Sequence, residues 1–261
     1  MSEPVNPQTD KRSADIAIVC THHAEIKPLM TRLDRMRKYS ENGAVFRGGF
    51  LEDSLRIAVV EAGSGFARHR KFTELLIKEH QPEWVLSVGF SSAIDESVQD
   101  GDIALANEIC DTHGNSLKVR CPIPETNRIR VRKHVVADSH PLTTDERHGL
   151  RTAYEADAVD TTSLAVAQAC QPMDEEQPAV RFLSVRGIVG TASEALTPRV
   201  VSQLFQPPLE QKKSLGTLWK KFRPDADLAP WIEQADQTAI NLNKFLLSVF
   251  EQLESRLKRR N

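Results

Sequence analysis

The chain has 261 residues and a formal net charge of -2, with 34 basic and 36 acidic side chains. Hydrophobic residues make up 40% and charged residues 27%, which is typical of ordinary globular proteins, and the length is enough to bury a sizeable core. The charge balance gives no electrostatic reason to expect nucleic acid or an anionic membrane as the main partner. We therefore expect a small-molecule partner.

Membrane and disulfide signals are missing from the sequence. No run approaches the roughly 20 apolar residues that span a bilayer, and residues 1–13 are polar without an apolar signal core. The cysteines lie far apart, at Cys20, Cys110, Cys121 and Cys170. They form no Cys-x-x-Cys pair, which predicts reduced thiols rather than disulfides or a zinc site. We expect a cytoplasmic protein with a loose tail over residues 1–13 and a basic tail over residues 258–261.

Apolar β-branched runs alternate with amphipathic stretches along the first half of the chain, which predicts strands alternating with helices in a largely parallel, wound sheet. The pair Gly48-Gly49 predicts a bend. The expected elements are a strand over 15–20, a helix over 24–36, a hairpin from 44–50 and 54–60, a helix over 66–80, and strands over 84–89 and 102–109.

The second half continues this alternation after a basic, proline-containing stretch over residues 111–141. We expect that stretch to be an irregular excursion with one strand, and its basic cluster over residues 118–134 to be a solvated face. The expected elements that follow are a helix over 143–155, a strand near Val159, a helix over 163–170, a strand over 180–187 and an amphipathic closing helix that includes residues 242–253.

In open α/β sheets, ligands bind beyond the carboxyl ends of the strands, so the polar residues after each apolar run are the candidates. Glu25 follows the first strand, where a carboxylate also fits the role of helix cap. His22 and His23 beside it have no third ligand at metal spacing and predict surface histidines. Gly63-Ser64-Gly65 would let an anion or a sugar approach backbone N–H groups, while Arg68 stands where a dinucleotide fingerprint requires a third glycine.

Further candidates follow the strands nearer the middle of the sequence. Gly89-Phe90-Ser91-Ser92 comes directly after a buried strand, although a tight turn alone would explain its small residues. Asp160-Thr161-Thr162-Ser163 precedes a helix, where an Asp is more often an N-cap than a site. Arg186 lies inside an apolar run, so its guanidinium needs a buried partner, and Gly190-Thr191 follows that strand.

Taken in order, these segments resemble the purine and uridine nucleoside phosphorylase superfamily, and specifically the methylthioadenosine/S-adenosylhomocysteine nucleosidases. The motifs that carry the resemblance are Ala24-Glu25-Ile26, Ala62-Gly63-Ser64-Gly65, Gly101-Asp102-Ile103, Asp160 with Ala165 and Ala167, and Arg186-Gly187-Ile188. The resemblance implies one three-layer α/β domain over residues 14–257, with a wound mixed sheet flanked by helices. It also implies a homodimer that needs no cofactor and no metal.

The resemblance further implies cleavage of the N-ribosidic bond of a purine-type nucleoside, with Glu25 orienting the attacking water. Phe90 stands where the phosphorylases use a hydroxyl residue to hold phosphate, so phosphorolysis is less supported than hydrolysis. Thr161 and Thr162 stand at the positions of the family's Met and ribose-binding Glu. Gly190 stands at the position of the base-protonating Asp, and a glycine cannot transfer a proton.

Glu194 is the carboxylate nearest in sequence to that vacant position, and Asp160 belongs to the paired polar segment before the preceding helix; both are candidate replacement acids. Thr161, Thr162, Thr191 and Ser193 could offer hydroxyl contacts to a sugar. Two other interpretations stay open: a non-catalytic nucleoside-binding protein, and an unrelated α/β protein whose glycine loop is only a tight turn. Carboxylates that point into the pocket would favour an enzyme.

Overall fold

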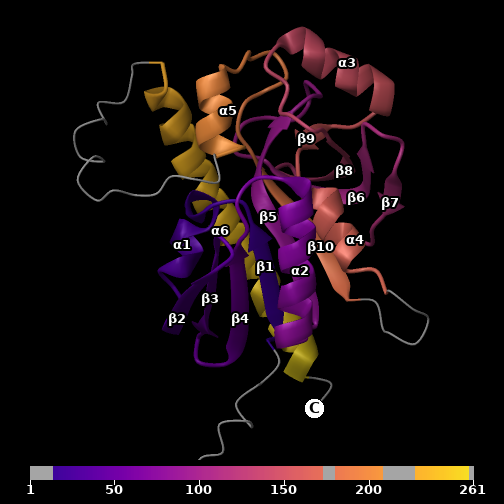
Figure 1. Ribbon diagram of the computed structural model, residues 1–261. Coiled ribbons are helices and arrows are strands. Elements are labelled where there is room, and N and C mark those ends of the chain that lie inside the picture. Colours follow the sequence, from indigo (N-terminus) through magenta and orange to yellow (C-terminus); the bar gives the residue numbers. More distant parts are fainter. Residues whose placement is uncertain (1–13, 173–179, 208–226, 259–261) are drawn as a thin grey trace, which may run out of the picture.

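The computed structural model describes residues 14–172, 180–207 and 227–258, and it shows a mixed sheet with helices on both faces (Figure 1). The strand order is β10-β6-β8-β9-β5-β1-β4-β3-β2, with β7 paired to β6. Strand β10 also pairs with β5, so that one end of the sheet closes on itself. The predicted tails over residues 1–13 and 259–261 lie outside the described residues, and Lys258 is the last residue of helix α6.

Strand β5 is the central strand of the sheet and is buried along its whole length. It pairs parallel with β1 and β10 and antiparallel with β9. The strands are β1 (Ile16–Cys20), β2 (Asp34–Glu41), β3 (Ala44–Leu51), β4 (Leu55–Glu61), β5 (Trp84–Ala93), β6 (Ile103–Asp111), β7 (Ser116–Lys118), β8 (Ile129–Val136), β9 (Ala158–Asp160) and β10 (Arg181–Ile188).

Two apolar clusters bury the two faces of the sheet. Ile16 and Ile18 of β1 belong to one cluster with residues of α6, while Ala17 and Val19 belong to the other with residues of α2 and α4. The helices are α1 (Lys27–Met30), α2 (Phe66–His80), α3 (Thr144–Tyr154), α4 (Ser163–Ala169), α5 (Pro198–Leu204) and α6 (Ala229–Lys258), and a short 3₁₀ turn covers His23–Glu25.

The strands and helices over residues 54–109 and 143–188 lie close to their predicted positions, but the predicted helix over residues 24–36 is wrong. After the 3₁₀ turn and the single turn α1, residues 34–41 form strand β2. Strand β2 pairs antiparallel with β3, and Tyr39 stacks on Phe46 with ring centroids 4.8 Å apart. Tertiary pairing therefore overrides the helical spacing of the apolar residues.

The predicted bend at Gly48-Gly49 is also wrong, and the alternative of a tight turn at Gly89–Ser92 is excluded. Gly48-Gly49 lies inside strand β3, where a Cβ atom on Gly49 would come within 2.9 Å of the Asp34 carbonyl oxygen, so the glycine permits close approach of β2. Strand β5 continues through Gly89-Phe90-Ser91-Ser92 to Ala93. The excursion over residues 111–141 contains two strands, β7 and β8, instead of one.

The basic segment over residues 118–134 is extensively ion-paired. Arg128 and Arg130 both contact Asp102, Arg132 contacts Glu125 and Asp157, and Lys133 contacts Glu108. All four cysteines are free in the structure. Among the described residues, no helix is long and apolar enough to cross a membrane.

Gly187 on β10 sets how closely helix α6 packs on the sheet, because a Cβ atom there would lie 2.5 Å from Thr238 Cγ2 and 2.9 Å from Leu242 Cδ1. We predict that Gly187→Ala lowers the free energy of unfolding by about 1–3 kcal/mol through overpacking. Gly149→Ala in α3 is the matched control, because nothing lies within 4 Å of its Cβ position. The control should be neutral or stabilising in urea denaturation, and equal stability of both variants would contradict the packing argument.

Candidate functional site

Polar side chains gather where strands β1, β5 and β10 reach their carboxyl ends. These strands run parallel, so their carboxyl ends meet at one edge of the sheet. The residues that the structure brings together there are Glu25, Gly89, Phe90, Asp160 and Arg186. All of them are among the residues predicted from the sequence, and the position follows the rule for ligand sites in wound sheets.

Glu25 is 2% exposed, and the described hydrogen bonds to its carboxylate all come from backbone N–H groups. Thr21 N and His22 N donate to Oε2 at 2.7 and 3.1 Å, and Phe90 N donates to Oε1 at 3.3 Å. The bond from His22 N belongs to the capping box of the 3₁₀ turn over His23–Glu25, so the capping role considered from the sequence is present. The third bond ties the carboxylate to strand β5 and fixes its direction.

Arg186 and Asp160 form a buried ion pair beside this carboxylate. Arg186 Nε lies 3.1 Å from Asp160 Oδ2, with side chains only 2% and 3% exposed, and Arg186 Nη2 donates to Ser87 Oγ at 2.8 Å. Asp160 Oδ1 accepts from the N–H groups of Thr162 and Ser163, both at 2.7 Å. The buried guanidinium thus has the partner that the sequence required.

Asp160 is ionised at neutral pH. The Arg186 charge and the backbone bonds outweigh the effect of burial and lower the pKa of Asp160 to about 2. Both of its oxygens are also engaged, so Asp160 fits a residue that positions Arg186 and does not fit the proton donor considered from the sequence.

Gly89 lies between Glu25 and Arg186. A Cβ atom at this position would come within 2.8 Å of Glu25 Oε1 and 3.1 Å of Arg186 Nη1. The two charged groups therefore approach the same point above bare backbone, and any larger residue at position 89 would displace one of them.

A second polar group surrounds Gly190, the vacant acid position. Gly190 has a φ of +89° and its N–H donates to Asp100 Oδ1 at 2.7 Å. Burial and the Glu194 charge raise the pKa of Asp100. Glu194 Oε2 accepts from both the N–H and the hydroxyl of Thr191, each at 2.8 Å, so Glu194 closes the turn that follows Gly190.

Arg147 reaches this turn from helix α3. Its Nη1 donates to the Thr191 carbonyl oxygen, while Nε and Nη2 have no hydrogen-bond partner although the residue is 0% exposed. Burial lowers the pKa of Arg147, and the charges of Glu194 and Asp100 raise it. Arg147 therefore carries two buried donors without a described partner close to the turn after Gly190, and such donors are costly unless a further group satisfies them.

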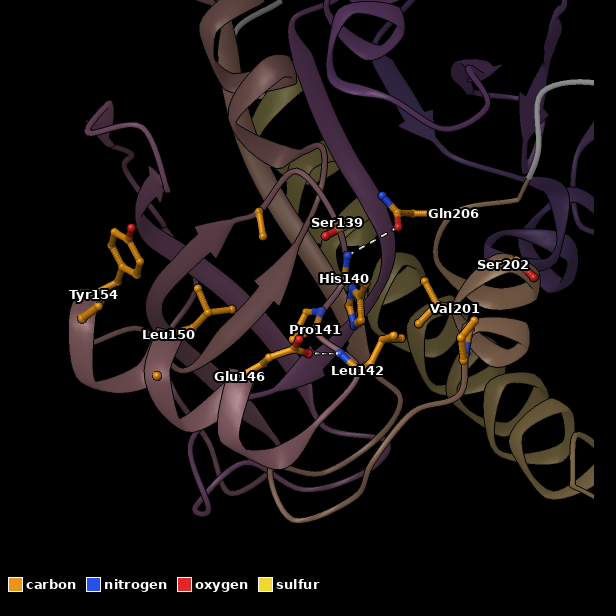
Figure 2. Close-up of a pocket in the computed structure, with 14 residues that line it drawn as sticks. Ser139, His140, Pro141, Leu142, Glu146, Leu150, Tyr154, Val201, Ser202 and Gln206 are labelled. Atoms are coloured by element: carbon orange, nitrogen blue, oxygen red, sulfur yellow. Dashed lines mark hydrogen bonds between the residues drawn. The ribbon is translucent and has the colours of Figure 1, made fainter.

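A pocket with a volume of about 680 Å³ opens between α3, α5 and residues 137–142 (Figure 2). His140 lines it, bonds to Ser92 Oγ through Nε2 at 2.7 Å, and stacks on Phe205. Burial lowers the pKa of His140 to about 3, so the imidazole is neutral. Leu142, Leu150 and Val201 make much of the wall apolar, which suits a pocket for an uncharged ring.

Some of the remaining predicted ligand residues lie in the glycine loop, and the others are buried in the core. Gly63 and Gly65 adopt positive φ angles of 74° and 111°, and the Ser64 hydroxyl between them donates to Pro207 O. Ser91 Oγ donates to Val159 O, which places this hydroxyl within the sheet. Thr161 and Thr162 are buried at the start of α4.

The sequence analysis missed Arg147, His140, Phe205 and Asp100. Arg147 is a charged residue in a charged helix, and no pattern marks it as buried. His140 lies beyond the carboxyl end of β8, so the strand-end rule would have found it if that strand had been located. Among the described residues, no group of three or more His, Cys, Asp or Glu is placed to hold a metal ion.

Geometry and comparison lead to the same class, a wound α/β protein with a mixed sheet flanked by helices. The Phosphorylase superfamily model matches residues 15–147. The chain belongs to this superfamily. Methylthioadenosine/S-adenosylhomocysteine nucleosidase of Staphylococcus aureus JH9 is 26% identical over 94 residues, which cover 36% of this chain and 41% of the relative's length.

Solved structures extend the similarity to nearly the whole chain. The methylthioadenosine/S-adenosylhomocysteine nucleosidase of Helicobacter pylori superposes with a TM-score of 0.69 at 15% identity, covering 92% of this chain and 99% of the other. A futalosine hydrolase mutant from Helicobacter pylori 26695 gives 0.67 at 16% identity, covering 92% and 100%. At these identities the likeness shows the shared fold, the mixed sheet flanked by helices.

The buried pair predicts an acid-dependent stability. The folded-state pKa of Asp160, about 2, lies below its unfolded value near 4, so the ionised carboxylate stabilises the fold above about pH 4 and loses this effect as the pH falls toward 2. Asp160→Asn should therefore flatten the loss of stability between about pH 4 and pH 2, measured by urea denaturation. Asp53→Asn, at an exposed ion pair, is the control and should retain the wild-type slope. An unchanged slope for Asp160→Asn would contradict the role of the pair.

Proposed function

We propose that this protein hydrolyses the N-ribosidic bond of a purine-type nucleoside. The observation that carries the proposal is the Glu25 carboxylate, buried, held by three backbone N–H groups and set opposite Arg186 across bare Gly89. The superfamily membership and the fold shared with nucleosidases and a futalosine hydrolase support the same reaction class.

In this reaction the bond between the anomeric carbon and the base nitrogen breaks, and its electron pair leaves with the base. The ribosyl centre becomes positively charged and is attacked by water, whose proton must be accepted. The proposal assigns the orientation of that water to Glu25 Oε1, which accepts a single described hydrogen bond, from Phe90 N. Phe90 offers no hydroxyl for phosphate, so water is the proposed nucleophile.

The departing base needs stabilisation that Gly190 cannot provide. Arg147 Nη1 donates to the carbonyl oxygen of Thr191, the residue after Gly190. Arg147 Nε and Nη2 have no described partner, and we propose that they bind the electron-rich base. Glu194, which holds Thr191, is the candidate replacement acid, and it can donate a proton to the base only from its protonated form. Arg147 would then stabilise the base while Glu194 protonates it.

The second candidate function is nucleoside binding without catalysis. It is favoured by two observations: Gly190 carries no acid, and Asp160 is fully engaged by Arg186 and backbone N–H groups. The two functions differ in turnover, so base release separates them.

Base release from adenosine, inosine, methylthioadenosine and S-adenosylhomocysteine, measured with and without phosphate, tests the proposal. We expect phosphate-independent release that falls by about 10²-fold or more in Glu25→Gln, because the amide cannot accept the proton of water. Glu74→Gln, on the exposed face of α2, is the control. Nucleoside binding without release would establish the second candidate function instead.

Leaving-group dependence tests Arg147 and Glu194. Arg147→Met should reduce release of hypoxanthine from inosine by about 10²-fold, because one preorganised donor group is lost. The same variant should cleave 4-nitrophenyl riboside nearly as well as wild type, because nitrophenolate departs without such help.

Glu194→Gln should show the same selectivity if Glu194 is the proton donor. Equal losses on both substrates would exclude a role at the leaving base for the residue concerned. Arg147→Met removes a buried, partly unpaired charge, so its folded fraction in urea should match or exceed that of wild type.

A further inference from the structure

Residues 204–207, which we call the α5 strap, join the end of helix α5 to loops of the proposed site. Leu204 O accepts from His22 Nε2 at 2.9 Å, and Pro207 O accepts from Ser64 Oγ at 2.6 Å. His22 Nε2 is also 3.9 Å from Glu25 Oε1. The strap thus bonds to the loop that carries Glu25 and to the glycine loop.

The same segment is bonded to the loop after β8. Phe205 stacks on His140 with ring centroids 3.9 Å apart and an interplanar angle of 12°. Gln206 Oε1 accepts from His140 N at 3.4 Å (Figure 2). Gln206 Nε2 donates to Asp138 O at 3.2 Å. Three loops at the carboxyl ends of the strands are therefore tied to one short segment.

The strap occupies polar and aromatic groups that would otherwise be available to bind a nucleoside. The Ser64 hydroxyl is the polar group of the glycine loop, and His140 is bonded to Ser92 just beyond Phe90 on β5. A ring spacing of 3.9 Å is already that of two stacked rings in contact, so no planar base fits between them. Leu204 and Phe205 are only 6% and 5% exposed, so their side chains are packed inside the protein and do not lie on its surface.

We propose that the α5 strap is an autoinhibitory contact that occupies the nucleoside site and is displaced when a nucleoside binds. The inference rests on the proposed function and concerns the regulation of that same site. Binding breaks the Phe205–His140 stack and the Ser64–Pro207 hydrogen bond. The apparent dissociation constant then equals the intrinsic one divided by the fraction of molecules with the strap released.

Two substitutions release the strap without touching Glu25, Arg186 or Arg147. Phe205→Ala removes the stack, and Gln206→Ala removes both bonds to residues 138–140. Each should lower the dissociation constant for adenosine or inosine, measured by calorimetry, by up to about tenfold, the worth of one aromatic or hydrogen-bond contact. The KM should fall with it while kcat changes little, because the chemical groups are intact.

Ser116→Ala on strand β7 is the control. Its hydroxyl donates to Glu108 Oε1 at an exposed position and makes no described bond to the strap, so the affinity should stay at the wild-type value. A weaker affinity in Phe205→Ala would show that Phe205 holds the ligand and would overturn the proposal, as would an unchanged affinity.

Hydrogen exchange gives a second measurement on the wild-type protein. The amides of Phe205 and Gln206 both donate to Val201 O. Saturating nucleoside should accelerate exchange at these two amides if the strap is displaced. Slower exchange would mean that the strap closes over the ligand, and it would overturn autoinhibition.

The outcomes separate the two proposals. If the wild-type protein turns over nucleoside but neither strap variant gains affinity, the autoinhibition proposal is wrong and the nucleosidase function stands. Absence of nucleoside binding and of base release in wild type and both variants overturns the proposed function, and the strap proposal with it.

Discussion

The buried guanidinium of Arg186 is the constraint on which the candidate site depends. A charge removed from water is tolerated only if its donors are satisfied, and here Asp160 and Ser87 satisfy them from β9 and β5. Asp160 is in turn fixed by the first N–H groups of α4. The pair therefore ties β5, β9, β10 and α4 together at the edge where Glu25 lies, and the bare backbone of Gly89 is what lets Glu25 approach it.

Much of this arrangement could be predicted from the sequence because it follows from local patterns. Buried strands read as continuous apolar runs, and the strand-end rule then pointed to Glu25, Gly89, Asp160 and Arg186 without any contact being known. The apolar run around Arg186 predicted that its guanidinium is buried and must have a partner, although only the structure shows that the partner is Asp160. The roles of these residues in catalysis stay predictions.

The parts that could not be predicted depend on tertiary contacts. Strand β2 has an exposed, charged sequence whose preceding residues keep helical spacing, and only pairing with β3 makes it a strand. Arg147 has the same local sequence appearance as a solvent-facing helix residue, yet it is 0% exposed because its side chain reaches Thr191 across the fold. The α5 strap consists of residues with no periodic pattern, and the proposal about it rests entirely on its tertiary contacts.

The missing acid at Gly190 is a property of the fold and not of one side chain. Gly190 has a φ of +89°, a conformation that residues with a Cβ atom rarely adopt, and a Cβ atom there would lie 3.2 Å from the Trp231 ring of α6. An aspartate at this position would therefore need both the backbone and α6 to move. Under the proposed function, stabilisation of a leaving base would come from neighbouring side chains instead, and Arg147 and Glu194 are both bonded to the next residue, Thr191. The position that the superfamily resemblance assigns to an acid has thus become a turn that holds other groups in place.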